Sequence, residues 1–335
     1  MRIAQISTPH IAAPPKGFGA SELIAGLLAE ELTRRGHHVT LFTTVDSPAR
    51  VSEVAYFPEA RGLEPFELRE LLHIGRALEG AREFDIIHNH CLSAGPAFGK
   101  LAPVPFISTL HYLSPAVRAF PRCTYVAVSE SQRRSLPDLN IAAVVHNAID
   151  PSAYTLRLEK KSYLLFLGRF HPNKGVHLAI EVAKRRGEHL IIAALPPPDD
   201  QRDYFDSHIR PHLGGLIEWV GGVEGPVKDE LLGHARCVLL PICWDEPFGL
   251  VYLEAMACGT PVLTFARGAA PEVVQHGRTG YVVRTLDEMI AALDRIQDID
   301  PWECRRHVEA HFTVSRMADD YLSVYQTLIE DLRLR

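Results

Sequence analysis

One stretch of the sequence places two carboxylates and a glycine at a spacing that suits ligand binding. It runs from Glu246 past Gly249 and Glu254 to Pro261, and we expect a helix to begin near Gly249. Free N–H groups at a helix start bind anions, and a glycine lets a ligand approach the backbone closely. A carboxylate one turn further, at Glu254, can accept hydrogen bonds from a ribose diol, and Glu246 can bind sugar hydroxyls. An acid near a helix start can also simply be favoured by the helix dipole, but the whole block is far more specific than one acid.

A second stretch supplies positive charge. Arg169 and Lys174 follow directly after an apolar segment, Tyr163 to Leu167, which reads as a strand. The arginine offers a planar fork to phosphate oxygens and the lysine a compact charge, so together they could neutralise a diphosphate without a metal. Alone, this pair would be a solvated basic turn. Its place at the carboxyl end of a strand, where open α/β sheets bind ligands, favours a functional role.

Two weaker candidates lie in the first half of the chain. Gly17 and Gly19 form a glycine-rich turn before a predicted helix, which suits a phosphate or sugar oxygen but also occurs in plain tight connections. His111 ends a predicted strand, where it could equally be a neutral histidine with a hydrogen-bonding role in the fold.

Two groupings suggest metal binding, and we assign neither to a metal. His88 and His90 would need a third ligand in the right geometry, so we expect them to line the site or pack beneath it. Asp298 and Asp300 spell a DxD element, but they lie in a predicted turn before a helix that begins at Pro301.

The elements that must position these residues alternate between short apolar strands and helices, which predicts an α/β fold with doubly wound parallel sheets. The first helix is expected from Ala20 to Arg35, ending at Gly36. The predicted strands are Ile3–Ser7, Val39–Thr43, Asp85–His88, Phe106–Thr109, Tyr125–Val128 and Ala143–His146 in the first half, and Tyr163–Leu167, Leu190–Ala194, Ile217–Val220, Val238–Pro241, Val262–Phe265 and Tyr281–Val283 in the second.

This repetition predicts two domains with a ligand cleft between them. We expect one domain over residues 1–150, which would hold the acceptor, and a second over residues 151–312, which would hold the donor. Residues 313–335 have apolar side chains at helical spacing, and we expect this terminal helix to pack back on the first domain.

Composition narrows the function classes. The 335 residues are 47% hydrophobic and 23% charged, enough for two full cores, and the net charge of −6 argues against nucleic-acid binding. No signal-peptide pattern or long apolar run is evident, and the six cysteines are scattered, as in a cytoplasmic protein with reduced thiols. Peripheral contact with a membrane stays open.

Taken together, these motifs resemble glycosyltransferase family 4, whose fold is GT-B, with two facing Rossmann-like domains. The E-x7-E element of the family matches Glu246 and Glu254, the Gly-Arg element matches Arg169 and Lys174, and Gly19 matches the amino-terminal loop. The resemblance implies that Glu246 contacts the donor sugar, Glu254 the ribose and His111 the transferred sugar. It also implies that backbone amides line the sugar and diphosphate at four positions: Phe248, Gly249, Leu250 and Val251.

The resulting expectation is a retaining, metal-independent glycosyltransferase that moves a sugar from a nucleotide diphosphate donor to a hydroxyl acceptor. Retention follows from the resemblance, and front-face attack follows because no carboxylate stands out as a nucleophile. No cofactor is expected. Three alternatives remain: a disaccharide phosphorylase, a nucleotide-sugar epimerase, and a non-catalytic sugar-nucleotide-binding partner subunit.

Overall fold

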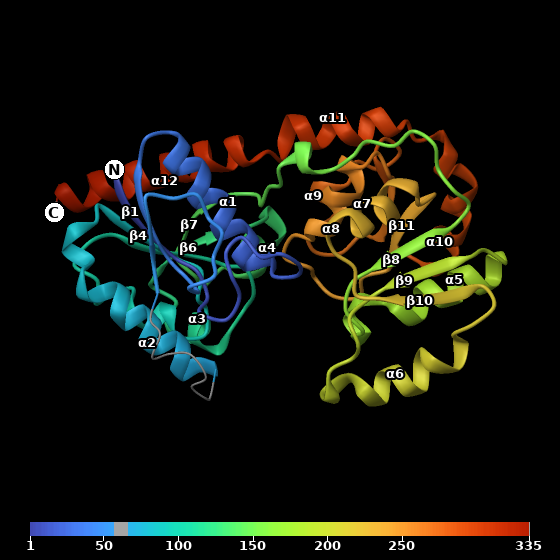
Figure 1. The fold of residues 1–335 in the computed structure, drawn as a ribbon, viewed down its shortest axis with the longest axis horizontal. Coiled ribbons are helices and arrows are strands. Elements are labelled where there is room, and N and C mark those ends of the chain that lie inside the picture. The colour runs from blue at the N-terminus through green and yellow to red at the C-terminus, as the bar shows by residue number, and fades with distance from the viewer. Residues whose placement is uncertain (57–65, 335) are drawn as a thin grey trace. The chain divides into compact units, whose positions relative to one another are not determined.

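The chain forms two compact units, each built around its own parallel sheet. The computed structural model describes residues 1–56 and 66–334, with the side chain of Phe66 left out (Figure 1). Unit 1 comprises Met1–Ala148 and Val314–Arg335, and unit 2 comprises Ile149–Thr313. The predicted α/β class with Rossmann-like parallel sheets is confirmed in both units.

The sheet of unit 1 has seven strands in the order β3-β2-β1-β4-β5-β6-β7. Strand β1 pairs in parallel with both β2 and β4, so the strand order reverses beside it, and ligands of open α/β sheets bind at such a point. The strands are β1 Arg2–Ile6, β2 His38–Phe42, β3 Glu53–Ala55, β4 Ile86–Asn89, β5 Phe106–Thr109, β6 Thr124–Ala127 and β7 Ile141–Val144.

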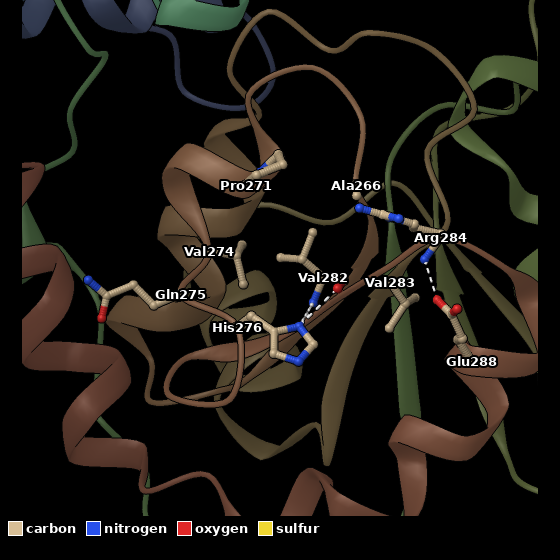
Figure 2. Close-up of a pocket in the computed structure, with 9 residues that line it drawn as sticks. All are labelled: Ala266, Pro271, Val274, Gln275, His276, Val282, Val283, Arg284 and Glu288. Carbon is tan, nitrogen blue, oxygen red and sulfur yellow. Dashed lines mark hydrogen bonds between the residues drawn. The ribbon is translucent and has the colours of Figure 1, made fainter.

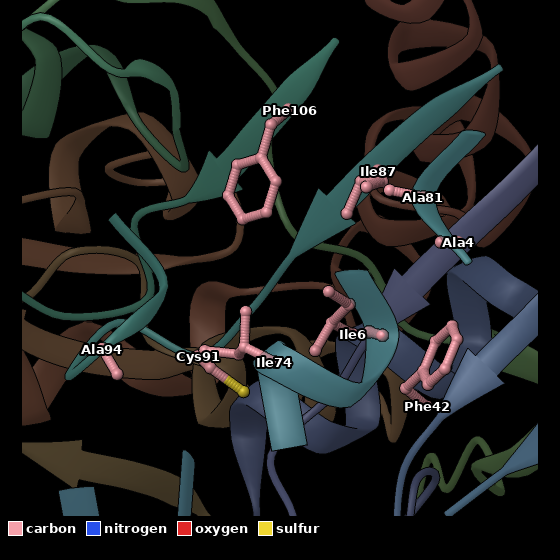
Figure 3. Close-up of a cluster of buried hydrophobic side chains, with 10 residues drawn as sticks. Ala4, Ile6, Phe42, Ile74, Ala81, Ile87, Cys91, Ala94 and Phe106 are labelled. Carbon is pink, nitrogen blue, oxygen red and sulfur yellow. The ribbon is translucent and has the colours of Figure 1, made fainter. Parts of the chain in front are cut away.

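Helices cover this sheet and close its core. A cluster of buried apolar side chains, including Ile6, Phe42, Ile74 and Ile87, joins the sheet to the second helix (Figure 3). The helical elements of unit 1 are α1 Ala20–Arg34, α2 Phe66–Glu79, η2 Ala81–Glu83, η3 Gly95–Phe98, α3 Pro115–Ala119, α4 Glu130–Ser135 and α12 Val314–Arg333.

The terminal helix α12 belongs to unit 1, although it is separated from the rest of that unit by the whole of unit 2. Its residues Met317, Tyr321 and Tyr325 are buried. At its first turns, Arg35 of unit 1 donates hydrogen bonds to the backbone oxygen and the hydroxyl of Ser315 and forms an ion pair with Asp319. The apolar face of α12 therefore completes the core of the first unit.

The sheet of unit 2 has six strands in the order β10-β9-β8-β11-β12-β13, all paired in parallel. The strands are β8 Leu164–Leu167, β9 Leu190–Ala193, β10 Ile217–Gly221, β11 Cys237–Leu240, β12 Val262–Phe265 and β13 Gly280–Val283. The helical elements are η4 Pro151–Ala153, η5 Pro172–Lys174, α5 Val176–Arg186, η6 Asp199–Gln201, α6 Arg202–His208, η7 Arg210–His212, α7 Gly225–His234, α8 Leu250–Ala257, α9 Ala270–Val273, α10 Leu286–Ala292, η8 Leu293–Asp298 and α11 Pro301–His311.

Within the described part of the chain, no helix is long and apolar enough to cross a membrane. The segment from Asp298 to Asp300 is the turn between η8 and α11, and the Asp300 side chain accepts a hydrogen bond from the Trp302 amide. That carboxylate is therefore committed to capping a helix.

Candidate active site

The charged residues singled out in the second half of the sequence follow two neighbouring strands of unit 2. Arg169 and Lys174 come after β8, whereas Glu246 and Gly249 come after β11. Strands β8 and β11 pair directly in parallel. Their carboxyl ends therefore lie at the same edge of the sheet, and this brings the two loops together.

Lys174 and Glu246 form the closest charged contact of this edge. Glu246 Oε2 lies 2.5 Å from Lys174 Nζ and accepts a second hydrogen bond, 2.7 Å long, from Trp244 Nε1. The side chains of Lys174 and Glu246 are only 19% and 13% exposed. The ammonium group also lies 5.7 Å from the centre of the Trp244 ring. Both charges are thus held in place and largely shielded from water, which strengthens their interaction with a ligand.

Two glycines allow the loops to approach this closely. Gly268 has φ of +53°, and a Cβ there would lie 2.3 Å from the carbonyl oxygen of Glu246. Gly175 has φ of +75°, and a Cβ there would lie 1.9 Å from the carbonyl oxygen of Pro241. Neither position accepts a larger residue without moving the backbone that carries the site.

The amides of the predicted diphosphate cradle lie at the start of α8. Gly249 is the residue before this helix, with φ of +88°, and no side chain caps the helix start. The first N–H groups of a helix have no intrahelical partner, so those at Leu250 and Val251 are suited to an anion. Phe248 is 2% exposed and anchors the turn against Phe312.

Glu254 lies on α8, one turn further along, and two donors share one of its oxygens. Lys228 Nζ lies 2.6 Å from Glu254 Oε1, and the Tyr154 hydroxyl donates to the same oxygen at 3.1 Å. The Glu254 side chain is 6% exposed. The other oxygen, Oε2, is therefore the one left for a ligand hydroxyl.

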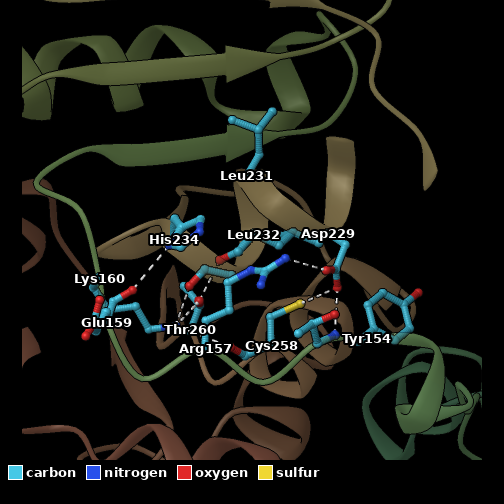
Figure 4. Close-up of polar contacts among 12 residues, drawn as sticks. Tyr154, Arg157, Glu159, Lys160, Asp229, Leu231, Leu232, His234, Cys258 and Thr260 are labelled. Atoms are coloured by element: carbon cyan, nitrogen blue, oxygen red, sulfur yellow. Dashed lines mark hydrogen bonds and ion pairs between the residues drawn. The ribbon is translucent and has the colours of Figure 1, made fainter. Parts of the chain in front are cut away.

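The segment that carries Tyr154 is held against the rest of unit 2 by a polar network (Figure 4). Asp229 accepts a hydrogen bond from the Thr155 amide at 2.7 Å and forms an ion pair with Arg157 at 3.1 Å. Lys160 donates to the carbonyl oxygens of Gly233 and Cys258 and to the hydroxyl of Thr260. These contacts hold Tyr154 against Glu254.

Sequence reasoning missed Lys228 and Tyr154. Both reach Glu254 from distant parts of the chain, 26 and 100 residues away. Neither lies in a motif, because one is in the first turns of α7 and the other follows η4. No sequence signal in this chain alone would have found them.

Arg169 differs from Lys174 in its surroundings. Its side chain is exposed, and it has no hydrogen bond or ion pair with any other residue within 1–56 and 66–334. A guanidinium group retains its five donors in that state, so Arg169 is available to an anionic ligand.

The first-half candidates, Gly19 and His111, both belong to unit 1. Gly19 precedes α1 with φ of +138°, beside Glu22, whose carboxylate accepts a 2.5 Å hydrogen bond from Thr8. His111 is half-buried, and its Nε2 lies 2.8 Å from His90 Nδ1. Burial lowers the pKa of His111 to about 4, so the ring is neutral near pH 7.

His88 and His90 are fully buried, so they pack beneath the surface. Across the described residues, no group of three or more His, Cys, Asp or Glu side chains is arranged to hold a metal ion.

A separate pocket of about 560 Å³ lies on unit 2 beside β13 (Figure 2). Its walls combine apolar residues such as Val274 and Val283 with the polar side chains of His276, Arg284 and Glu288. None of the sequence-predicted site residues lines it.

Comparisons with known proteins identify both halves of the chain as similar to glycosyltransferases. A family model described as Glycosyltransferase Family 4 matches residues 22–153, and one described as Glycosyl transferases group 1 matches residues 153–301. An uncharacterized glycosyltransferase of Methanocaldococcus jannaschii is 23% identical over 98% of this chain and 99% of its own length.

Solved structures are similar over nearly the whole chain. AviGT4, a glycosyltransferase involved in avilamycin A biosynthesis, is 26% identical with a TM-score of 0.77, covering 98% of both chains. HepE of Anabaena, solved in complex with UDP and glucose, has a TM-score of 0.77 at 17% identity, covering 98% of this chain and all of its own.

Proposed function

This chain belongs to the family 4 glycosyltransferases with the GT-B fold, and we propose that it moves a sugar from a nucleoside diphosphate donor to an acceptor hydroxyl, with retention and without a metal ion. The observation that carries the proposal is the loop pair after β8 and β11. It gathers Arg169, Lys174 and the start of α8 at one edge of the sheet of unit 2.

These groups suit the charge that develops when a sugar–phosphate bond breaks. The sugar carbon becomes oxocarbenium-like, and negative charge grows on the departing diphosphate. Arg169 would supply a planar pair of donors, Lys174 a compact charge, and the α8 amides neutral donors that need no reorganisation. Two cations and a helix start can together stabilise this leaving group, which is the basis for proposing that no metal ion takes part.

The donor would be oriented by the two glutamates of the E-x7-E element. Glu254 Oε2 would accept hydrogen bonds from the ribose hydroxyls, while Lys228 and Tyr154 hold Oε1. Glu246 would bind a hydroxyl of the donor sugar. HepE was solved with UDP and glucose, which supports a nucleoside diphosphate sugar as the donor class.

Retention is proposed to proceed by attack from the face that the diphosphate leaves. Glu246 would be a poor nucleophile, because Lys174 and Trp244 both donate to Oε2 and stabilise its charge. In the proposed step the acceptor oxygen bonds to the sugar carbon, the sugar–phosphate bond breaks, and the acceptor proton passes to the departing phosphate oxygen. His111 would contact the transferred sugar.

The proposal is tested with UDP-, GDP- and ADP-sugars titrated calorimetrically in excess EDTA. At least one should bind, and Glu254→Ala should weaken it roughly 10–100-fold, the value of a hydrogen bond to a charged group. Glu288→Ala, at an exposed glutamate of the separate pocket, is the control and should not change affinity. If Glu254→Ala and Glu288→Ala bind the donor with equal affinity, Glu254 does not bind the ribose.

Product analysis separates the proposed reaction from other reactions on the same fold. Incubating the donor with an acceptor should yield a glycoside with the anomeric configuration of the donor, in the absence of added phosphate. A requirement for inorganic phosphate, or an epimerised donor as the product, would contradict the proposal.

A further inference from the structure

A single chain of hydrogen bonds connects the terminal helix α12 to His111 through the interior of unit 1. Six of its members are completely buried, and His111 alone reaches the surface. In order, the members are His111, His90, Gln5, Tyr325, His88, Thr109 and Tyr321.

The part of this hydrogen-bond series next to His111 passes through Gln5 on β1. His111 Nε2 lies 2.8 Å from His90 Nδ1, and His90 Nε2 lies 2.9 Å from Gln5 Oε1. The amide nitrogen of Gln5 then donates a 2.9 Å hydrogen bond to the Tyr325 hydroxyl. Gln5 therefore joins the histidine pair to α12.

The other half returns from α12 to the sheet. The Tyr325 hydroxyl lies 2.7 Å from His88 Nδ1, and His88 Nε2 lies 2.6 Å from Thr109 Oγ1. The Thr109 hydroxyl lies 2.7 Å from that of Tyr321, one turn before Tyr325 on α12. Both tyrosines are thus fixed at their hydroxyl ends.

The protons in this chain must all point the same way. Burial lowers the pKa of His88 and His90 well below the usual range and that of His111 to about 4, so each ring is neutral and has one N–H. Gln5 Oε1 can only accept, so the proton of His90 lies on Nε2 and its Nδ1 must accept from His111. The proton of His111 then lies on Nε2, and its Nδ1 carries a free lone pair.

We propose that Tyr325 and Gln5 are positioning residues that fix the tautomer of His111, so that this ring presents Nδ1 as a hydrogen-bond acceptor for a ligand hydroxyl. The tautomer is independent of the proposed function, and only its effect on transfer rests on that function. Neutral His111 would accept a sugar hydroxyl without placing a positive charge beside it.

Tyr325 is needed because a glutamine amide can fit its site in two orientations. The hydroxyl of Tyr325 accepts from the Gln5 amide nitrogen and can donate to His88 Nδ1, so turning Gln5 over would require every proton from His111 to Tyr321 to reverse direction together. Without that hydroxyl, Gln5 can turn over and donate to His90. The proton of His90 would then lie on Nδ1, and that of His111 would move to Nδ1.

The test uses the full-length protein labelled with nitrogen-15 in its histidines. Proton–nitrogen spectra distinguish the protonated from the bare ring nitrogen, and the signals of His111 are those lost in His111→Gln. Wild type should show His111 protonated at Nε2. Tyr325→Phe should give a mixture of tautomers. Tyr125→Phe is the matched control, because it removes another buried hydroxyl of unit 1, one that donates to the Phe120 carbonyl oxygen.

Three results would overturn the proposal: a wild-type His111 protonated at Nδ1, an unchanged tautomer in folded Tyr325→Phe, or an equal change in Tyr125→Phe. The wild-type spectrum is informative even if a variant does not fold, and it needs no enzymatic activity.

A second readout measures the effect on transfer. Tyr325→Phe should lower kcat about three- to tenfold, the value of one ordinary hydrogen bond, and leave the KM for the donor unchanged. Tyr125→Phe should leave both constants unchanged. A loss of the same size in both variants would indicate general destabilisation and contradict the positioning role. If wild type shows no transfer, the proposed function fails while the tautomer result still stands.

Discussion

Replacing Lys174 with methionine removes the buried charge at the edge of the sheet of unit 2. Methionine keeps an unbranched stem of similar length, so the packing over the Trp244 ring, now 5.7 Å from the ammonium group, is largely retained. Of the two groups that donate to Glu246 Oε2, only Trp244 Nε1 then remains, at 2.7 Å. The perturbation is therefore electrostatic rather than steric.

The magnitude follows from how shielded the charge is. With only 19% of its side chain exposed, Lys174 interacts with a bound diphosphate more strongly than a surface lysine would. One charge-assisted hydrogen bond contributes about 1.5–3 kcal/mol, which is roughly a 10–100-fold loss in affinity for a nucleoside diphosphate. Because negative charge grows during transfer, kcat should fall further, on the order of 10²–10³-fold.

The assay is calorimetric titration of the nucleoside diphosphate alone, which separates the two members of the ion pair. Lys174→Met should weaken binding, because a positive charge is lost. Glu246→Gln should leave binding unchanged or tighten it, because it removes the negative charge 2.5 Å from Lys174 and frees the ammonium group for phosphate. Glu246→Gln should nevertheless lower sugar transfer, since the proposed contact to the sugar is altered.

Lys184→Met is the matched control, since Lys184 is an exposed lysine in the last turn of α5. It should change neither affinity nor turnover. Two results would contradict the proposed role of Lys174: Lys174→Met binding the diphosphate as well as Lys184→Met does, or Glu246→Gln weakening diphosphate binding as much as Lys174→Met.

Three further predictions concern the surroundings of the site and the core of unit 1. Gly268→Ala should slow transfer by up to about 10²-fold, because its Cβ would displace the Glu246 backbone. The control is Gly277→Ala, which should keep the wild-type turnover, because Gly277 also has a positive φ but there is open space around its Cβ. Burial raises the pKa of the Glu70 carboxyl from 4.5 to about 7, so the folded state holds that proton more tightly and loses stability as pH rises from 4.5 to 7. The free energy of unfolding of Glu70→Gln should therefore exceed that of wild type at pH 8, by up to ~3 kcal/mol, but not at pH 4. Lys228→Met should weaken donor binding about tenfold in calorimetry, by freeing the ribose-binding carboxylate from its partner.

Most of the strands were predictable because a strand buried on both faces of a parallel sheet is a short apolar run. Leu164–Leu167 and Val262–Phe265 are examples, and the structure places strands there. The short strand Glu53–Ala55 and the helix Phe66–Glu79 were not predicted. Glu53–Ala55 is only three residues long and partly exposed, so it lacks that apolar signal.

The site was predictable only where its residues share a motif. Arg169, Lys174 and Glu246 each follow a strand within a few residues, so parallel pairing alone brings their loops together. Lys228 could not be placed this way, because its contact with Glu254 depends on how α7 packs against α8, which no local pattern encodes. The hydrogen-bond chain from α12 to His111 could not be predicted either, because its partners lie up to 320 residues apart in the sequence.

We propose that positive side chains and helix-start amides hold the diphosphate leaving group without a divalent ion. The most direct measurement is the initial rate of sugar transfer in excess EDTA, compared with the rate in excess Mg²⁺, for wild type and for Arg169→Gln. We expect equal wild-type rates in the two buffers and a much lower rate for Arg169→Gln in both. A wild-type rate that disappears in EDTA and returns with Mg²⁺ would contradict it.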